Sequence, residues 1–148
     1  MEKRGQYLDA LSLQIKRLHA MIEDMVKIAR LDNQQPQEET GAININNLVR
    51  TVGRLKRELA QEMDVTLQYR LDVDLPALNG RYHQLQQALE GLVDNAIKYA
   101  PAGTVQLTTS HENNETVQIS VRDDGIGIPP AEMPYIFEAY FRGRNPII

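Results

Sequence analysis

Apolar side chains recur at spacings of three and four along the first thirty residues. These positions are Leu8, Leu11, Ile15, Leu18, Ile22, Met25 and Ala29. Charged residues such as Asp9, Lys16 and Glu23 lie between them, so one stripe of the helix is apolar and the rest of its surface is polar and suited to solvent. Because a single apolar stripe needs a covering surface, we expect residues 1–32 to form a bundle helix that pairs with a partner.

A polar stretch interrupts this pattern. Residues 33–41 contain Pro36, end in Gly41 and include no large apolar side chain. Such a composition is typical of a linker between domains. We therefore place a domain boundary at 33–41 and expect a second domain over 42–148.

The second domain mixes helical and strand patterns. We expect a short strand at 42–45, a helix capped by Asn46 or Asn47 and running to about Met63, and strands at 65–71 and 75–78. A helix follows from Arg81 to Ala100, before Pro101, and then strands at 104–110 and 116–123 joined by the turn residues 112–115. Interleaved helices and strands with a hairpin predict an α+β protein in which helices cover one face of a mixed sheet.

Composition narrows the function classes. Sixteen basic and twenty acidic residues give a net charge of −4, which argues against a nucleic-acid partner. The absence of cysteine excludes disulfides and cysteine zinc sites. No apolar run approaches the roughly 20 residues that span a bilayer. We expect a cytoplasmic segment without membrane contact, and the sequence leaves open whether a parent protein is membrane-anchored.

The stretch Asp123-Asp124-Gly125-Ile126-Gly127-Ile128 carries the clearest sign of chemistry. Gly125 and Gly127 allow the backbone to turn sharply and approach a ligand closely. By the two-residue period of a strand, Asp123 shares a face with Val121 and the apolar positions before it, so we expect it to point toward the helix-covered side. A carboxylate there accepts hydrogen bonds, either from a ligand or from nearby backbone amides.

A second candidate lies on the preceding helix. At about 100° per residue, Gly91, Asn95 and Lys98 fall in one narrow strip beside the core stripe. An amide next to an ammonium group suits a triphosphate with magnesium. The strip alone fits an ordinary amphipathic helix with a solvated edge even better.

Together and in this order, the two features resemble the ATP-binding domain of sensor histidine kinases, which belong to the Bergerat-type ATPases. The segment 136–142 is similar to the phenylalanine box at the start of that family's ATP lid, and 25–32 is similar to the end of its second dimerisation helix. The resemblance implies that 42–148 is part of a truncated α/β sandwich.

The resemblance also implies roles for individual residues. Asp123 would bond the adenine amino group, Asn95 would hold Mg²⁺ and phosphate oxygens, Lys98 would contact phosphates and Tyr99 would line the pocket of ATP. The implied nucleotide site further includes Gly125, Ile126, Gly127 and Ile128 of the loop, Phe137 as a lid anchor and Arg142 at the start of the lid. No side chain of this segment is predicted to act as a catalyst itself.

The chain departs from the family pattern in three ways. Gly91 stands where family kinases usually carry a further asparagine, which predicts weaker binding of magnesium nucleotide. The family's phosphoacceptor is a histidine followed by an acid, with a proline a few residues on. His19 is followed by Ala20 and Met21 with no proline before Pro36, and we expect His83 and His111 to lie on the surface, so none of the three is predicted to be phosphorylated. The chain also stops inside the lid, so we expect this fragment alone to be inactive.

The resulting interpretation is a fragment of a protein-histidine kinase of a two-component system. It would form a homodimer through its N-terminal helix, and the phosphate would pass to a response regulator. A nucleotide-binding module without catalysis and a simple dimerisation module are the alternatives. A hydrolytic ATPase is disfavoured. The resemblance implies that hydrolytic Bergerat-type enzymes use a glutamate to activate water at the position that Gly91 matches, and glycine cannot act as a base.

Overall fold

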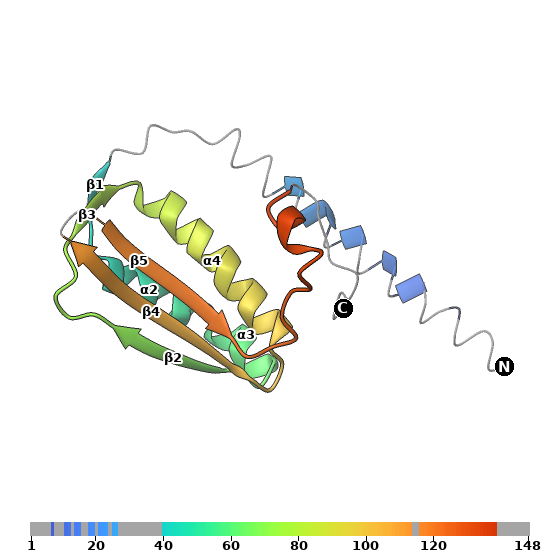
Figure 1. Cartoon of the computed structure of the whole chain (residues 1–148). Helices are drawn as coiled ribbons and strands as arrows, with labels where there is room; N and C mark the ends of the chain where they lie inside the picture. The colour runs from blue at the N-terminus through green and yellow to red at the C-terminus, as the bar shows by residue number, and fades with distance from the viewer. Residues whose placement is uncertain are drawn as a thin grey trace. The chain divides into compact units, whose positions relative to one another are not determined.

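The computed structural model describes residues 40–113 and 116–138, together with helical positions 7, 11, 12, 14, 15, 18, 19, 21–23, 25 and 26. The chain divides into two compact units, residues 1–38 with residue 148, and residues 39–147. All elements named below belong to the second unit and are labelled in Figure 1. Within the described residues, no helix is long and apolar enough to cross a membrane.

The described positions of the first unit are helical, as the heptad pattern predicts. The apolar side chains of the predicted stripe are open to solvent, with Leu11, Ile15, Leu18, Ile22 and Met25 between 52% and 65% exposed. Leu8 and Ala29 lie outside the described residues. An isolated helix with an exposed apolar stripe gains stability when that stripe is covered.

Strand β1 (Gly41–Ile43) pairs with β3 (Leu78–Gly80) in a two-stranded antiparallel sheet. The prediction of a strand at 75–78 was wrong, since the strand begins at Leu78. Pro76 has no N–H group to donate to a ladder, which explains why pairing starts after it. The predicted strand 42–45 also ends early, because Asn44 already caps the next helix.

Helix α2 (Ile45–Leu55) begins two or three residues earlier than predicted. Its N-cap is Asn44, whose side-chain oxygen accepts the N–H of Asn47 at 3.0 Å. The predicted single helix to Met63 is also wrong, because α3 (Arg57–Glu62) starts after an interruption at Lys56. Neither proline nor glycine stands at position 56, so no helix-breaking residue at that position explains the interruption.

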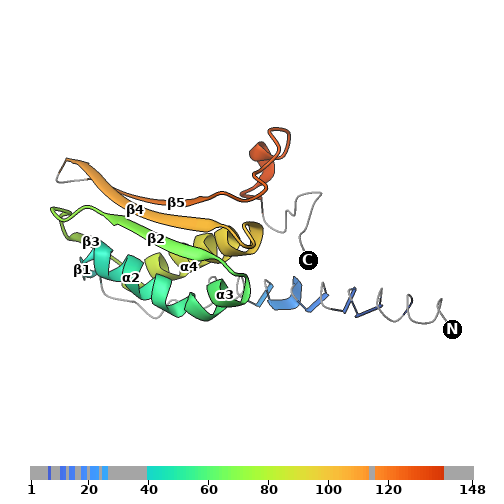
Figure 2. The same ribbon diagram turned by 90° about the horizontal axis from the view of Figure 1, so that it is seen from below.

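The main sheet has the order β2-β4-β5. Strand β2 (Thr66–Leu71) runs parallel to β4 (Thr104–Asn113), and β4 runs antiparallel to β5 (Thr116–Asp123). The helices lie on one face of this sheet (Figure 2). The mixed sheet with helices on one face is thus confirmed.

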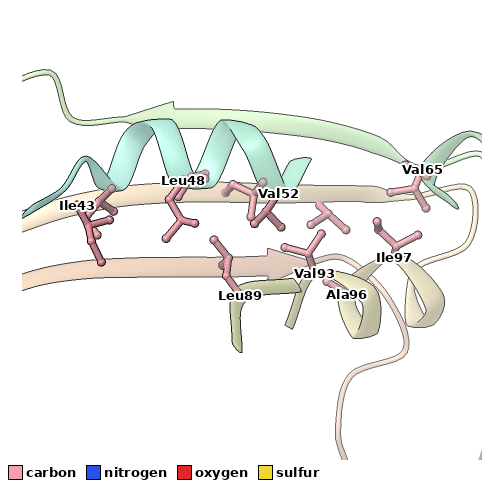
Figure 3. Close-up of a cluster of buried hydrophobic side chains, with 13 residues drawn as sticks. Ile43, Leu48, Val52, Val65, Leu89, Val93, Ala96 and Ile97 are labelled. Carbon is pink, nitrogen blue, oxygen red and sulfur yellow. The ribbon is translucent and has the colours of Figure 1, made fainter. Parts of the chain in front are cut away.

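The core lies between α2, α4 (Tyr82–Tyr99) and the inner face of the sheet (Figure 3). Its fully buried side chains include Leu48, Val49, Val52, Val93, Ile97, Val105 and Leu107. The predicted bounds of α4 hold within a residue at each end. The periodicity of this helix predicts an apolar stripe of Leu85, Ala88, Leu89, Leu92, Val93 and Ala96, which needs correction. Leu92 is 53% exposed and Ala88 is exposed, whereas Ile97 is fully buried. The buried face is therefore rotated away from Leu92, because α4 packs against both α2 and the sheet.

Candidate functional site

The loop after β5 is seated against the C-terminal end of α4 (Figure 1). The N–H of Ile126 donates to the carbonyl oxygen of Tyr99 at 3.3 Å. A Cβ atom at Gly125 would collide with that same carbonyl group, so this close approach requires glycine. Gly127 has φ +69°, a left-handed conformation that other residues adopt at a cost. The two glycines are therefore needed for different reasons, contact at one position and backbone angle at the other.

The two aspartates at the end of β5 have different surroundings. Asp123 pairs across the ladder with the fully buried Val105, so it lies on the helix-covered face, as predicted. Its side chain is nevertheless exposed, because the strand ends there, and its Oδ1 accepts the N–H of Gly125 at 3.0 Å. Asp124 accepts the N–H of Thr104 at 2.7 Å through its Oδ1. Asp124 thus holds the loop to the start of β4.

Asn95 and Lys98 both present exposed side chains on the last turns of α4. Within the described part of the chain, neither side chain has a hydrogen bond or an ion pair, so both are available to a ligand. A Cβ atom at Gly91 would find nothing within 4 Å, so this side of the helix is open. Leu92, half exposed, lies about 60° around the helix from Asn95.

The acidic residues next to this strip are engaged elsewhere. The Lys56 Nζ lies 3.1 Å from a carboxylate oxygen of Glu90 and 3.1 Å from one of Asp94. Partial burial disfavours the charged amine, but these hydrogen bonds outweigh burial and raise the pKa of Lys56 above its ordinary value. Glu90 also accepts a hydrogen bond from Gln86 at 2.9 Å. Lys56 lies at the interruption between α2 and α3, and its ion pair keeps Glu90 from serving as a free base.

A pocket of about 400 Å³ lies at the junction of α4 and the loop. Its walls are the chain from Tyr99 to Gly103 and the loop residues Asp124, Gly125 and Ile126. Of the predicted site residues, Tyr99, Gly125 and Ile126 line this pocket, whereas Asn95, Lys98 and Asp123 lie outside its wall.

The remaining predicted residues follow Gly127 in the chain. Ile128 is 52% exposed and Phe137 is 92% exposed, just after the short helix η1 (Met133–Tyr135). Phe137 therefore packs against no core within the described part of the chain. Arg142 lies outside the described residues.

Sequence reasoning missed three contributors to this region. It names Asp123 but not Asp124 as a candidate, places Leu92 in the apolar core stripe and attaches no role to Lys56. The adjacent acid in a glycine loop signals Asp124, but the sequence holds no local signal for Lys56, whose partners are more than thirty residues away.

Comparison with known proteins gives the context for this geometry. The family described as "Histidine kinase-, DNA gyrase B-, and HSP90-like ATPase" matches residues 80–146. The adaptive-response sensory kinase SasA of Synechocystis sp. is 32% identical over 140 residues, covering 94% of this chain and 37% of the relative. The chain thus spans little more than a third of that curated relative.

Solved structures of histidine kinases have folds similar to that of this chain. Full-length ShkA in complex with AMPPNP has a TM-score of 0.66 and 29% identity, covering 89% of this chain and 28% of ShkA. The catalytic domain of histidine kinase ThkA, in a nucleotide-free form, has a TM-score of 0.65 and 28% identity, covering 70% of each chain. ThkA in complex with response regulator protein TrrA shares the fold, with a TM-score of 0.68 and 22% identity over 92% of this chain and 40% of that one. The chain carries an ATPase domain of the histidine kinase, DNA gyrase B and HSP90-like family and is homologous to sensor histidine kinases.

Proposed function

We propose that this domain binds ATP with Mg²⁺ as the nucleotide-binding part of a protein-histidine kinase in a two-component system. The observation that carries the proposal is that the Asp123–Gly127 loop is bonded to the Tyr99 carbonyl at the end of α4. The same helix presents Asn95 and Lys98, whose side chains have no partner among the described residues. This arrangement, in a domain of the ATPase family, supports one ligand with a base at the loop and phosphates along the helix.

The base end of the site would depend on Asp123. One carboxylate oxygen accepts the Gly125 N–H, which leaves the other oxygen for the adenine amino group. Gly125 and Gly127 permit the base to approach the backbone closely. The half-exposed side chains of Ile126 and Ile128, together with Tyr99, offer apolar surface to the base.

The phosphate end would depend on Asn95 and Lys98. The side chain of Lys98 supplies a positive charge to the phosphates, and the amide oxygen of Asn95 is the ligand that this helix offers to Mg²⁺. No group of three histidine, cysteine or acidic side chains that could hold a metal occurs among the described residues. This fits magnesium, which keeps several waters and takes phosphate oxygens as ligands. When bound, the ion neutralises charge on the transferred phosphoryl group.

The lid would close over this ligand. Phe137 is almost fully exposed and therefore has apolar surface to bury when the lid closes. We assign Arg142 to the start of the same lid.

The phosphate acceptor would be a histidine on a helix outside this sequence, and a response regulator would then receive the phosphate in the cytoplasm. We assign this role to none of the histidines of this chain, because none is followed by both the acid and the proline of the family pattern; His19 lies 3.7 Å from Glu23, His83 lies on α4 and His111 is bonded to Asp72 at 2.8 Å. The complex of ThkA with TrrA supports the response regulator as partner.

The exposed apolar stripe of the first unit supports a homodimer formed through that helix. Ile15→Asp places a charge in the middle of the stripe. We expect the full chain to sediment as a dimer and the variant as a monomer. A monomeric parent chain at concentrations well above micromolar would contradict this part of the proposal.

Nucleotide binding is tested by calorimetry with a non-hydrolysable ATP analogue and Mg²⁺. Asp123→Asn keeps one acceptor for the Gly125 N–H but turns an amide N–H₂ toward the adenine amino group, so we expect affinity to fall about ten- to a hundredfold. Asp74→Asn, an exposed change on a distant turn, is the matched control. Equal binding by the Asp123 variant and the control would refute the assigned site.

The alternative is a nucleotide-binding module without catalysis. Gly91 favours it, because the open helix face there supplies no second magnesium ligand. Joining this chain to a histidine-bearing helix and the rest of the lid, then assaying phosphohistidine, separates the two functions. Binding without any phosphohistidine would favour the module.

A further inference from the structure

A second groove lies beside strand β2, and none of the residues proposed for the nucleotide site lines it. It has a volume of about 700 Å³ and runs between α2, α3 and β2. Its lining residues are Asn47, Arg50, Thr51, Gly53, Arg54, Arg57, Ala60, Gln61, Val65, Leu67 and Tyr69. Figure 2 shows α2 beneath β2, along the length of the strand.

The charged side chains that line this groove are all positive. Three arginines line it, whereas no aspartate or glutamate does, in a chain whose net charge is −4. Arg50, Arg54 and Arg57 are all exposed, and within the described residues none of them forms an ion pair. The one side-chain hydrogen bond that they form among the described residues runs from Arg54 to Thr51 Oγ1 at 3.3 Å. Three unpaired guanidinium groups in a row attract carboxylates or phosphates.

The edge of the sheet lies along the same groove. In the described structure β2 pairs only with β4, so its other edge carries unpaired backbone groups. The N–H of Thr66 points to the β4 side, where it donates to Gly103 at 2.9 Å. By alternation, Leu67, Tyr69 and Leu71 direct their N–H and C=O groups to the open edge. A six-residue strand without proline is a template for another strand.

The floor of the groove is apolar and firmly packed. Tyr69, 42% exposed, lies directly on the backbone of α2, where a Cβ atom at Gly53 would collide with its ring. Ala60 and Val65 are buried beneath the arginines. A partner would therefore find backbone hydrogen bonds on one side, an aromatic ring below and positive charge on the other side.

We propose that this groove docks an acidic peptide segment, which adds to β2 as an extra strand and places its carboxylates against Arg50, Arg54 and Arg57. The spacing of the arginines favours an extended peptide over separate small anions. Arg50 and Arg54 are about 6 Å apart along the helix axis, and side chains on one face of an extended strand are about 6.7 Å apart. Acidic residues at every second position therefore match the spacing of Arg50 and Arg54.

The test uses the full chain and a short peptide of alternating glutamate and valine, labelled with a fluorophore. We expect saturable binding, with shifts of the amide signals of Leu67, Tyr69 and Leu71 in NMR spectra. Arg54→Gln should weaken binding about fivefold. Arg70→Gln is the matched control, because Arg70 alternates with Tyr69 and lies on the other face of β2. Equal loss in both variants, or no loss in either, overturns the proposal.

Two further peptides test strand addition itself. N-methyl groups on one alternate set of residues block the peptide edge that faces β2, and those on the other set block the outer edge. We expect one peptide to lose binding and the other to keep it. Any other result overturns strand addition. A lysine-valine peptide should not bind, and inorganic phosphate or single-stranded RNA that binds as tightly as the acidic peptide would refute peptide recognition.

Discussion

Lys56 offers the sharpest test of how this fold positions the candidate site. Its ammonium group lies 3.1 Å from Glu90 and 3.1 Å from Asp94, and the three side chains are only 17%, 27% and 21% exposed. Lys56→Met removes the charge but keeps the aliphatic stem. Two neighbouring carboxylates on α4 are then left without their cation. Hydrogen bonds between charged groups contribute about 1.5–3 kcal/mol each. Because these groups keep some solvent contact, we expect a net loss of about 2 kcal/mol.

Urea unfolding of the full chain, followed by circular dichroism, measures this loss. We expect a lower midpoint at an unchanged dependence on urea, and no change for Arg122→Met, which removes an exposed unpaired cation from β5. The double change Lys56→Met with Glu90→Gln should be less than additive. A loss below about 0.5 kcal/mol, the range of ordinary surface changes, would refute the reasoning.

The pH dependence of the same interaction has a defined sign. The pKa of Lys56 is raised in the folded chain above its ordinary 10.5, so its stabilisation is complete below that value. It is lost as pH rises through the higher folded pKa. The parent chain should therefore lose stability in strong alkali more steeply than Lys56→Met. Parallel alkaline profiles would contradict this.

Three other predictions follow from single positions. Gly91→Asn, in open space, should tighten binding of the magnesium-ATP analogue; unchanged affinity in calorimetry would contradict a role for this position. Gly125→Ala should displace the loop from Tyr99 and abolish nucleotide binding, whereas Gly91→Ala should stabilise the chain by about 0.5–1 kcal/mol in thermal unfolding. The Asp74 N–H and the His111 ring hold the pKa of Asp72 below its ordinary 3.8, so its stabilisation is present above that pH and lost as pH falls through the lower folded pKa. Acid titration of Asp72→Asn should show a shallower loss; identical acid profiles would argue against it.

Much of the fold was predictable from short-range patterns. The helix α4 ends before Pro101 because proline cannot continue a helix, and the hairpin of β4 and β5 follows from alternation around a turn. The same alternation placed Asp123 on the helix-covered face, which its pairing with Val105 confirms. The motif of Asn95, Lys98, Asp123 and the two glycines was also identified from the sequence, because each residue type has its own chemistry. Its role in binding a nucleotide stays a prediction.

Tertiary structure decided what depends on distant partners. The ion pairs of Lys56 with Glu90 and Asp94 join residues more than thirty positions apart, and the exposure of Leu92 follows from how α4 packs between α2 and the sheet. Parallel pairing of β2 with β4 aligns Thr66 with Thr104, across an intervening helix. Side-chain periodicity reports only the nearest turns of the chain, because its physical origin is the local backbone geometry. Contacts between elements depend on packing of the whole core, so the sequence alone determined the elements and the chemical groups, and the fold determined which of those groups meet.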